Sequence, residues 1–472
     1  MKRRDFLKKI TVGTAAFVVA IANLALLADN GPTGIFDGTI VLGRPTDSSI
    51  TINVLSNDQL EAYFEYGTQS GVYTDQTVTS TIEAGVPFEN VIANLQSNTR
   101  YYYRMRFRQP GGGEFGQGQE YTFHTQRAPG STFTFCVQSD SHLGDSGTKT
   151  ALYEITLRNA VANDPDFHID LGDTFMTEKI TSGSYEEALQ VALNHRPYFD
   201  IIARSAALFL VNGNHEGELG WKLDGTGDNV AINSTRVRQL LYPTPRPGGF
   251  YSGNSTPEPY IGIRDGYYSW TWGDALFVAL DPFWYTTVKA KQSGDCWDWT
   301  LGHEQYSWLK DTLEQSNATF KFVFIHNLFG ELEGRGGIET AGYYEWGGHN
   351  TDGTWGFDTR RPGWAMPIHD LMAANNVSIV FHGHDHLFIK QDLDGIVYQL
   401  VPRPSHRNYD NIKNAEKFGY VNGDVLGNSG HLRVTVADSE VRVDYVRAYL
   451  PEDENPDRIN GEAVYTYTIT RQ

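Results

Sequence analysis

The chain has 472 residues, which is long enough for two domains, and it carries a formal net charge of −19. This acidic balance argues against a nucleic-acid groove, because a phosphate backbone requires a basic surface. The two cysteines, Cys136 and Cys296, form no CxxC pair, which excludes a thiolate zinc site and a disulfide framework. Cys136 stands in the apolar run FTFCV and is expected to be buried. A bridge between the two cysteines is the less favoured alternative.

The N-terminus has the pattern of an export signal. A basic head, MKRRDFLKK, precedes nineteen residues without a charge. Arg3 and Arg4, followed by Asp5-Phe6-Leu7-Lys8, fit a twin-arginine signal, with Lys2 where Ser or Thr is commoner. A plain Sec signal or a retained anchor is the alternative, since nineteen apolar residues can span a bilayer. We assign residues 1–30 to this leader. We therefore expect a periplasmic or secreted protein that uses the twin-arginine translocon, tethered to the membrane if the leader is not cleaved.

Residues 31–127 read as an all-β region. Short alternating runs, such as LEAYFEYGT and RYYYRMRFR, are separated by turns, and no helical period appears. Their number and length suit a β-sandwich of about 100 residues. Leu95, Thr99, Tyr101 and Tyr103 resemble the L-x-P-x-T-x-Y-x-Y stretch of fibronectin type III domains, with Ser97 in place of the proline. The resemblance implies a fibronectin type III-like sandwich with a tyrosine at its corner, followed by the linker QRAPGS.

Residues 131–472 change to an α/β pattern. Strand-like runs, among them TFTFCVQSD, DFHIDLGD and AALFLVNGNHE, alternate with helical stretches such as KTALYEITLRNAVAN and YEEALQVALNHRPYFDIIAR. This alternation predicts a layered α/β domain. The final strands, including HLRVTVADSEVRVDYVRAY, have no helices between them and are expected to complete a second sheet that packs on the first.

Five of the predicted strands are followed by polar clusters that can bind metal. They are Asp140-Ser141-His142, Gly172-Asp173, Gly213-Asn214-His215-Glu216, His326 and Gly383-His384-Asp385-His386. Ligands of open α/β sheets gather at the carboxyl ends of the strands, so the five clusters predict one site.

The residue types in these clusters favour a pair of metal ions. Carboxylate and imidazole groups suit Zn, Fe, Mn or Ni. A shared carboxylate can hold two ions about 3.5–4 Å apart, and such a pair lowers the pKa of bound water and neutralises phosphate oxygens. A protein that contains this centre needs no nucleophilic side chain to attack phosphorus.

The ordered set DxH…GDxx…GNH(D/E)…xxxH…GHxH closely resembles the signature of calcineurin-like metallophosphoesterases, and the preceding sandwich resembles the layout of purple acid phosphatases. The resemblance implies a four-layer α/β domain with two packed mixed sheets flanked by helices. It implies one metal held by Asp140, His142, Asp173 and His386, and a second held by Asp173, Asn214, His326 and His384. It also implies that His215 acts on the phosphate as a proton donor or charge stabiliser, and that Glu216 orients neighbouring groups without binding metal.

Two positions depart from the purple enzymes. They use DxG and GDxxY, whereas this chain has His142 in the first block and Met176 where the iron-binding tyrosine stands. We therefore expect a centre of Fe, Zn or Mn that is not purple.

Several polar residues outside the five blocks have less specific interpretations. His382 shares a strand face with the ligands but lies outside GHxH, so we expect it to form hydrogen bonds or to orient the ligands without binding metal itself. His168 and Asp170 are expected to pack in the sheet or form a salt bridge. His195, His303 and His369 lie on helical stretches and are expected to be surface or capping residues. His349 and Arg335, in a glycine-rich stretch after His326, are candidates for substrate contact, with a solvated loop as the equally favoured alternative.

These expectations define an exported enzyme with a dinuclear centre that hydrolyses small-molecule phosphate esters by attack of metal-bound hydroxide, with phosphomonoesters favoured. One alternative is a phosphodiesterase acting on nucleotides or lipid head groups. The other is a non-catalytic surface binding protein with a structural metal site.

Overall fold

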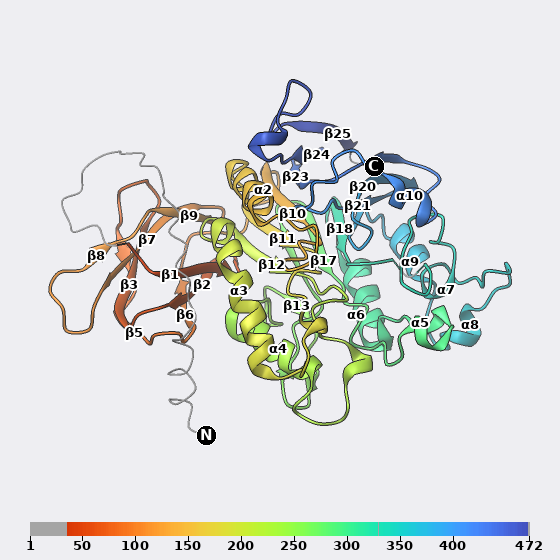
Figure 1. Ribbon diagram of the computed structural model, residues 1–472, viewed down its shortest axis with the longest axis horizontal. Coiled ribbons are helices and arrows are strands. Elements are labelled where there is room, and N and C mark those ends of the chain that lie inside the picture. The colour runs from red at the N-terminus through yellow and green to blue at the C-terminus, as the bar shows by residue number, and fades with distance from the viewer. Residues whose placement is uncertain (1–34, 329, 471–472) are drawn as a thin grey trace. The chain divides into compact units, whose positions relative to one another are not determined.

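The computed structural model describes residues 35–328 and 330–470 (Figure 1). The leader assigned to residues 1–30 lies outside this part, so the export signal and the anchor stay predictions. In the described ranges, no helix combines the length and the apolar character that crossing a membrane requires.

The described residues form two compact units. The first consists of residues 35–39, 54–88 and 102–121, and the second contains the others. The division of the chain at residues 127–131 that the linker suggests therefore stays a prediction.

The N-terminal strands form two sheets. One has the order β4-β3-β7-β8, with β5 beside β3 and β9 beside β7. Its central strands, β3 (Leu60–Gly67) and β7 (Arg100–Arg108), are antiparallel, and alternate residues of β3 are buried. The short strands are β4 (Asp75–Gln76), β5 (Ser80–Ile82), β8 (Gly116–Gln117) and β9 (Tyr121–His124). The other sheet has the order β1-β2-β6, from β1 (Gly38–Gly43), β2 (Ser49–Ser56) and β6 (Phe88–Ala93). The predicted N-terminal β-sandwich is confirmed.

Tyr101 fastens a corner of this region. Its phenol oxygen accepts a hydrogen bond from the backbone N–H of Gln96 at 2.8 Å, and the side chain is buried. A tyrosine bonded to the backbone a few residues upstream is the corner that the fibronectin type III resemblance implies.

The first sheet of the α/β domain has the order β12-β11-β10-β23-β24-β25. Parallel strands β10 (Phe133–Gln138), β11 (Phe167–Asp170) and β12 (Ala207–Leu210) continue into the antiparallel strands β23 (Gly430–Val436), β24 (Glu440–Arg447) and β25 (Ala463–Thr470). Cys136 is buried on the face of this sheet that the helices cover. It packs with Tyr153 and Leu157 of α2 (Thr150–Ala162) and with Ile202 of α3 (Tyr185–Ala203). Both cysteines are free and buried, so no bridge joins them.

The second sheet has the order β13-β16-β17-β18-β19-β21-β20-β22. Its parallel centre consists of β17 (Ala275–Ala279), β18 (Phe320–Phe324), β19 (Ile379–His382) and β21 (Ile396–Leu400). The flanking strands are β13 (Ser252–Gly253), β16 (Tyr268–Trp272), β20 (Phe388–Leu393) and β22 (Asp424–Leu426), and a separate ribbon pairs β14 (Pro257–Glu258) with β15 (Gly262–Ile263).

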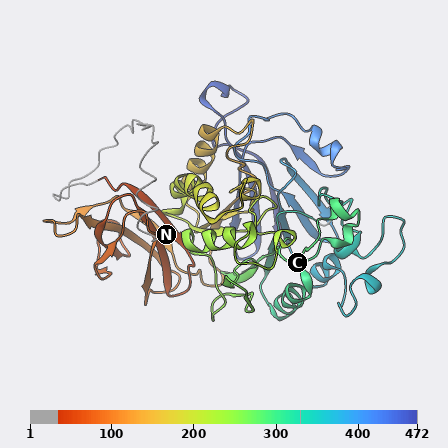
Figure 2. The same ribbon diagram turned by 60° about the horizontal axis from the view of Figure 1, so that its bottom comes forward.

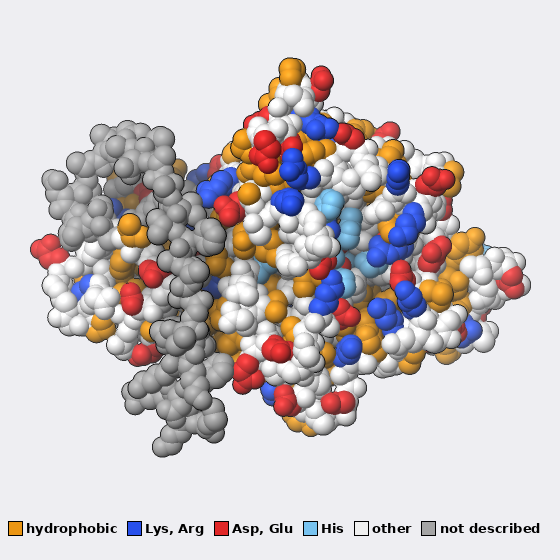
Figure 3. Space-filling model, in the orientation of Figure 1, with side chains coloured by type: hydrophobic (Ala, Val, Ile, Leu, Met, Phe, Trp, Pro, Cys, Tyr) orange, Lys and Arg blue, Asp and Glu red, His pale blue; other side chains and the backbone are white. Residues whose placement is uncertain are grey.

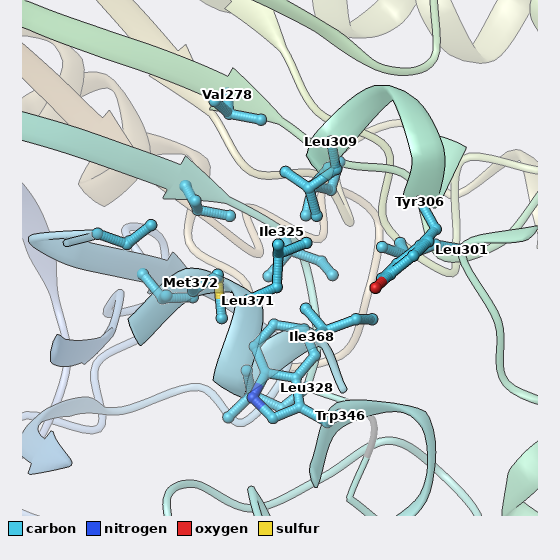
Figure 4. Packing of buried hydrophobic residues seen from close by; sticks show 14 of the residues in the cluster. Val278, Leu301, Tyr306, Leu309, Ile325, Leu328, Trp346, Ile368, Leu371 and Met372 are labelled. Atoms are coloured by element: carbon cyan, nitrogen blue, oxygen red, sulfur yellow. The ribbon is translucent and has the colours of Figure 1, made fainter. Parts of the chain in front are cut away.

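Phenylalanine rings fill the space between the two sheets. The ring of Phe135 stacks on that of Phe167 with centroids 5.4 Å apart, and it meets Phe277 and Phe381 of the second sheet at 5.2 and 6.3 Å. Because side chains alternate along a strand, the neighbouring Val278 faces the other way and packs with Leu309 and Leu371 (Figure 4). Each buried apolar side chain of this kind contributes about 1.5–3 kcal/mol to folding.

Helices lie beside both sheets (Figures 1 and 2). Ser184 caps α3 by accepting a hydrogen bond from Glu187 N at 3.3 Å, and Asn229 caps α4 (Val230–Leu241) in the same way. The helices beside the second sheet are α5 (Ala290–Ser293), α6 (Gly302–Gln315), α7 (Tyr344–Gly347), α8 (Phe357–Arg360), α9 (Ile368–Ala374) and α10 (Lys413–Lys417). The predicted arrangement of two packed mixed sheets flanked by helices is confirmed.

The prediction that His195 and His369 are surface or capping residues is wrong. Both side chains are buried on their helices. His195 lies among the rings of Phe175 and Phe199, and His369 bonds Tyr398 and Asp394. Their helices are covered on that face by neighbouring elements, which a helical pattern alone does not reveal.

Candidate metal centre and active site

The polar clusters after β10, β11, β12, β18 and β19 are brought together by the topology of the two sheets. Three of the side chains, from Asp140, His142 and His386, offer ligand atoms that all lie within 4.8 Å of one another, and so do those of Asp173, His326 and His384. Histidine side chains accordingly gather on one face of the molecule, with lysine and arginine side chains beside them (Figure 3). The first group contains side chains from both sheets, and so does the second.

The first group is centred on one carboxylate oxygen. Oδ1 of Asp140 lies 3.3 Å from Nε2 of His142 and 3.2 Å from Nε2 of His386. Oδ2 of the same carboxylate accepts a hydrogen bond from the backbone N–H of His384 at 2.9 Å, which fixes its orientation.

One oxygen of Asp173 faces both groups. Oδ2 of Asp173 lies 3.1 Å from Nε2 of His326 in the second group and 3.4 Å from Nε2 of His142 in the first. Its other oxygen, Oδ1, accepts a hydrogen bond from the backbone N–H of His215 at 2.8 Å. The carboxylate is therefore oriented by the hydrogen bond to Oδ1, with Oδ2 placed between the two groups.

The imidazole rings are held by the nitrogen that points away from the centre. Nδ1 of His142 lies 3.0 Å from Asp145 Oδ2, and Nδ1 of His326 lies 2.8 Å from the carbonyl oxygen of Leu171. In His384 it is Nε2 that is held, 2.9 Å from the carbonyl oxygen of Glu333. Such outer bonds fix the ring and the tautomer of a metal-binding histidine.

Three buried polar atoms of the predicted ligands have no hydrogen-bond partner among the described residues. They are Oδ1 of Asn214, Nε2 of His326 and Nδ1 of His384. A buried polar atom without a partner costs free energy, about 1–3 kcal/mol each. A cation in contact with all three would remove this penalty, so the donor set fits a metal ion.

The charges of the centre are strongly coupled. Burial alone would raise the pKa of Asp140 and of Asp173, but the neighbouring histidines, His326 above all, hold both pKa values well below the usual range. Burial likewise opposes the protonation of His142 and His326, yet the carboxylates raise their pKa values to about 9 and about 10. The two carboxylates therefore remain charged and require positive charge beside them, from protons or from metal ions.

The backbone of the site adopts an unusual conformation. Asp140, His142, Asp173, His384 and His386 all have positive φ angles, between 46° and 77°. A side chain in this region costs about 1–3 kcal/mol, and such residues cluster at functional sites. Glycines permit the close packing: a Cβ on Gly383 would lie 2.0 Å from Ser139 Oγ, and one on Gly213 would lie 2.4 Å from Asp173 N. This explains the glycine in the GHDH and GNHE blocks.

Glu216 braces two of the loops. Its buried carboxylate accepts hydrogen bonds from the backbone N–H groups of Asp173 (2.9 Å), Thr174 (2.6 Å), Phe175 (3.2 Å) and Gly213 (2.6 Å). Burial, with the nearby charge of Asp173, raises the pKa of this carboxyl. Glu216 thus contacts the backbone of the Asp173 loop, and no hydrogen bond joins it to the rings of the described histidines.

His215 lies at the edge of the two groups, half-buried. Its Nε2 is 3.9 Å from Asp173 Oδ2, and its Nδ1 is 3.0 Å from Glu178 Oε2. Sequence reasoning missed Glu178, which stands in η1 (Thr177–Lys179) and belongs to no recognised motif. It also missed Asp145, which holds His142, although the spacing of three residues after His142 was a signal.

Arg335 and His349, the two candidates for substrate contact, differ in position. Arg335 donates hydrogen bonds from Nη1 to the carbonyl oxygen of His384 and to Oδ1 of Asp385, both at 2.8 Å, so it adjoins the centre. His349 is exposed and contacts Trp355 and the carbonyl oxygen of Gly347, and within the described part of the chain no bond joins it to the histidine groups. Met176 is buried, and His382 is buried outside both groups.

The fold and the site define a metal-dependent phosphoesterase. Residues 133–388, more than half of the chain, match the family described as calcineurin-like phosphoesterase, and the chain belongs to this family. It is accordingly a metal-dependent phosphoric ester hydrolase, as the sequence motifs predicted.

Solved structures show the same fold over nearly the whole chain. One, "Structure of PhoD", has a TM-score of 0.64 and 13% sequence identity, and covers 92% of this chain and 90% of its own. A second, purple acid phosphatase PPD1 from yellow lupin (Lupinus luteus) seeds, has a TM-score of 0.59 and 16% identity, and covers 92% and 75%. No curated protein is significantly similar to this chain in sequence. The predicted likeness to the layout of purple acid phosphatases is confirmed.

Proposed function

We propose that the protein is an exported phosphoesterase that holds two metal ions at one site and hydrolyses phosphomonoesters in preference to diesters. The observation that carries this proposal is the position of Asp173, whose Oδ2 faces a histidine nitrogen of each group at 3.1 and 3.4 Å. A carboxylate shared by two ions is the arrangement used for in-line displacement at phosphorus.

The residues available divide into two sets around Asp173. Asp140, His142 and His386 would join it in holding one ion, and Asn214, His326 and His384 would join it in holding the other. Bound ions of Fe, Zn or Mn would lower the pKa of a water molecule and neutralise the charge of the phosphate oxygens. Because Met176 replaces the tyrosine of purple acid phosphatases, we infer that the loaded protein lacks their colour.

His215 supplies the remaining chemistry. With Nδ1 held by Glu178, its Nε2 is free to meet a phosphate bound at the centre. A protonated imidazole in this position can donate a proton to the leaving oxygen or stabilise developing charge. A protein that only bound metal for structural reasons would not need an oriented histidine beside the centre, which argues against the surface binding protein.

The test compares turnover of p-nitrophenyl phosphate and of its bis ester by metal-replete protein, with elemental analysis of the same samples. We expect hydrolysis of both, faster for the monoester, and loss of both with a chelator. His215→Ala should lower kcat by about 10²–10⁴-fold at unchanged metal content. The exposed His303→Ala is the matched control. A faster reaction with the diester would favour the phosphodiesterase, and turnover of neither ester would favour the binding protein.

Export is tested separately. Replacement of Arg3 and Arg4 by lysine should retain the protein in the cytoplasm if the leader uses the twin-arginine translocon. Export that persists in this variant would point to the Sec route. Recovery of the exported wild type in the membrane fraction would identify the leader as a retained tether.

A further inference from the structure

Arg403 is a buried guanidinium without a carboxylate partner. It follows β21 and is 7% exposed. Its Nη2 donates a hydrogen bond to Thr148 Oγ1 at 2.6 Å, and its Nε is 3.4 Å from Ser405 Oγ. Among the described residues no Asp or Glu forms an ion pair with it. Burial lowers the pKa of Arg403, and the charges of Asp140, Asp145 and Asp173 offset this only in part. Buried charges are normally paired with an opposite charge. The described residues supply none for Arg403, so an anion from outside the chain could pair with it.

Two short hydrogen-bond paths place Arg403 beside the first metal group. The hydroxyl of Thr148, which accepts from Arg403, donates in turn to the carbonyl oxygen of His142 at 2.7 Å. On the other side, the backbone N–H of Arg403 donates to Asn428 Oδ1 at 2.9 Å, and Asn428 Nδ2 donates to the carbonyl oxygen of His386 at 2.9 Å. The guanidinium is thus linked through Thr148 to the backbone of His142, and the backbone of Arg403 is linked through Asn428 to that of His386.

His406 adds a second polar group to the same corner. The segment that contains it pairs with the segment after His142: Thr148 forms a backbone bridge with His406, and Lys149 N donates to Ser405 O at 2.8 Å. Nδ1 of His406 is buried without a hydrogen-bond partner among the described residues. The absence of a side chain on Gly147 leaves room for this ring, since a Cβ there would lie 2.8 Å from Nε2 of His406.

We propose that Arg403, with His406 beside it, binds the terminal phosphoryl group of a phosphomonoester, and the inorganic phosphate released from it. The proposal rests on the proposed function. A terminal phosphoryl group carries up to two negative charges on three non-bridging oxygens, and a guanidinium matches this geometry with paired donors. A diester has one charge fewer and an ester substituent in place of one of these oxygens. Arg403 therefore favours monoesters over diesters.

The experiment measures binding of inorganic phosphate to the metal-loaded full chain by titration calorimetry. Arg403→Met should raise the Kd for phosphate about 10- to 100-fold, the effect of losing a charge-assisted hydrogen bond to an anion. Arg403→Lys keeps the positive charge but lacks the paired N–H donors of the guanidinium. Its Kd for phosphate should lie between those of the wild type and Arg403→Met. Arg407→Met is the matched control, because Arg407 lies in the same segment but is exposed and paired with Asp453.

Turnover of the two esters provides the second measurement. In Arg403→Met, kcat/KM for p-nitrophenyl phosphate should fall by a factor similar to the rise in Kd, while kcat/KM for the bis ester should change by less than about threefold. An unchanged Kd for phosphate in a variant of full metal content would overturn the proposal, and so would equal losses with both esters. If the methionine variant does not fold, the lysine variant carries the same comparison.

The two proposals fail in different ways. Phosphate binding that depends on Arg403 in a protein that hydrolyses neither ester would sink the proposed function and leave this site intact. Hydrolysis of both esters at wild-type rates by Arg403→Met would overturn the Arg403 site and leave the proposed function intact.

Discussion

His215 and Glu178 form a pair that is joined twice. Nδ1 of His215 lies 3.0 Å from Oε2 of Glu178, and the backbone N–H of Glu178 donates to the carbonyl oxygen of His215 at 3.0 Å. The hydrogen bond with His215 lowers the pKa of the Glu178 carboxyl, so this group is charged at neutral pH. A charged carboxylate at Nδ1 fixes the orientation of the ring.

We expect Glu178→Gln to lower kcat for p-nitrophenyl phosphate about 10- to 100-fold with little change in KM. The amide retains the shape of the side chain but loses the negative charge that faces Nδ1 of His215 and orients its ring. Metal content, measured on the same preparation, should not change, because Glu178 belongs to neither metal group. Glu154→Gln, on the exposed face of α2, is the control. A wild-type kcat in Glu178→Gln would show that His215 acts without its partner.

The convergence of six of the predicted ligands, three in each group, could be foreseen because the blocks that contain them all follow strands. Parallel strands of one sheet present their carboxyl ends at the same edge, so the blocks that contain Asp140 and Asp173 had to meet. His326 and the GHDH block follow strands of the other sheet, β18 and β19. The phenylalanine contacts between the sheets are what brings them to the same place.

The roles of Glu178 and Arg403 and the burial of His195 could not be foreseen. They depend on contacts between distant segments, which no hydrophobic periodicity or motif in the sequence reveals. Glu178 stands in a single turn of 3₁₀ helix, and its partner lies 37 positions further along the chain. Arg403 lies after a strand in a segment whose path is fixed by side chains such as Asn428 and Thr148. Burial of His195 was likewise hidden, because a helical pattern does not say which neighbour covers a given face.

Removal of the metal ions should lower the thermal stability of the protein as well as abolish turnover. The predicted ligands then include two buried carboxylates and three buried polar atoms without partners among the described residues. A ligand present at about 1,000 times its Kd stabilises a protein by about 4 kcal/mol, so we expect a chelator to lower Tm by more than about 5 °C. Asn214→Ala should reduce this shift, whereas the exposed Asn317→Ala should not. Equal Tm values with and without chelator would contradict a bound metal.

Glu216→Gln should weaken the hydrogen bonds that join the Asp173 loop to the Gly213 loop. The carboxylate accepts four backbone hydrogen bonds, two on each oxygen. An amide nitrogen in place of one oxygen would face two N–H donors, and each buried donor left unpaired costs about 1–3 kcal/mol. We expect a lower urea midpoint together with a lower metal content, measured by elemental analysis. The exposed Glu314→Gln is the matched control, and full metal content in the Glu216 variant would exclude this bracing role.

The acid stability of the protein should depend on Glu218, which lies between two buried arginines. Its carboxylate accepts hydrogen bonds from Nη2 of Arg238 at 3.0 Å and from Nε of Arg264 at 3.1 Å. Burial opposes ionisation, but the two guanidinium groups outweigh it and lower the pKa of Glu218 from 4.5 to about 2. Because the folded state holds the lower pKa, this group contributes on the order of 3 kcal/mol to stability above pH 4.5.

That contribution should be lost as the pH falls from about 4.5 to about 2. Glu218→Gln should therefore lower the urea midpoint at pH 7, since breaking a buried ion pair costs about 3–5 kcal/mol, and should flatten the decline of stability between these two pH values. The measurement is urea unfolding at a series of pH values for the variant, the wild type and the surface variant Glu154→Gln. Parallel curves for Glu218→Gln and wild type would mean that Glu218 is not the group whose protonation weakens the fold in acid.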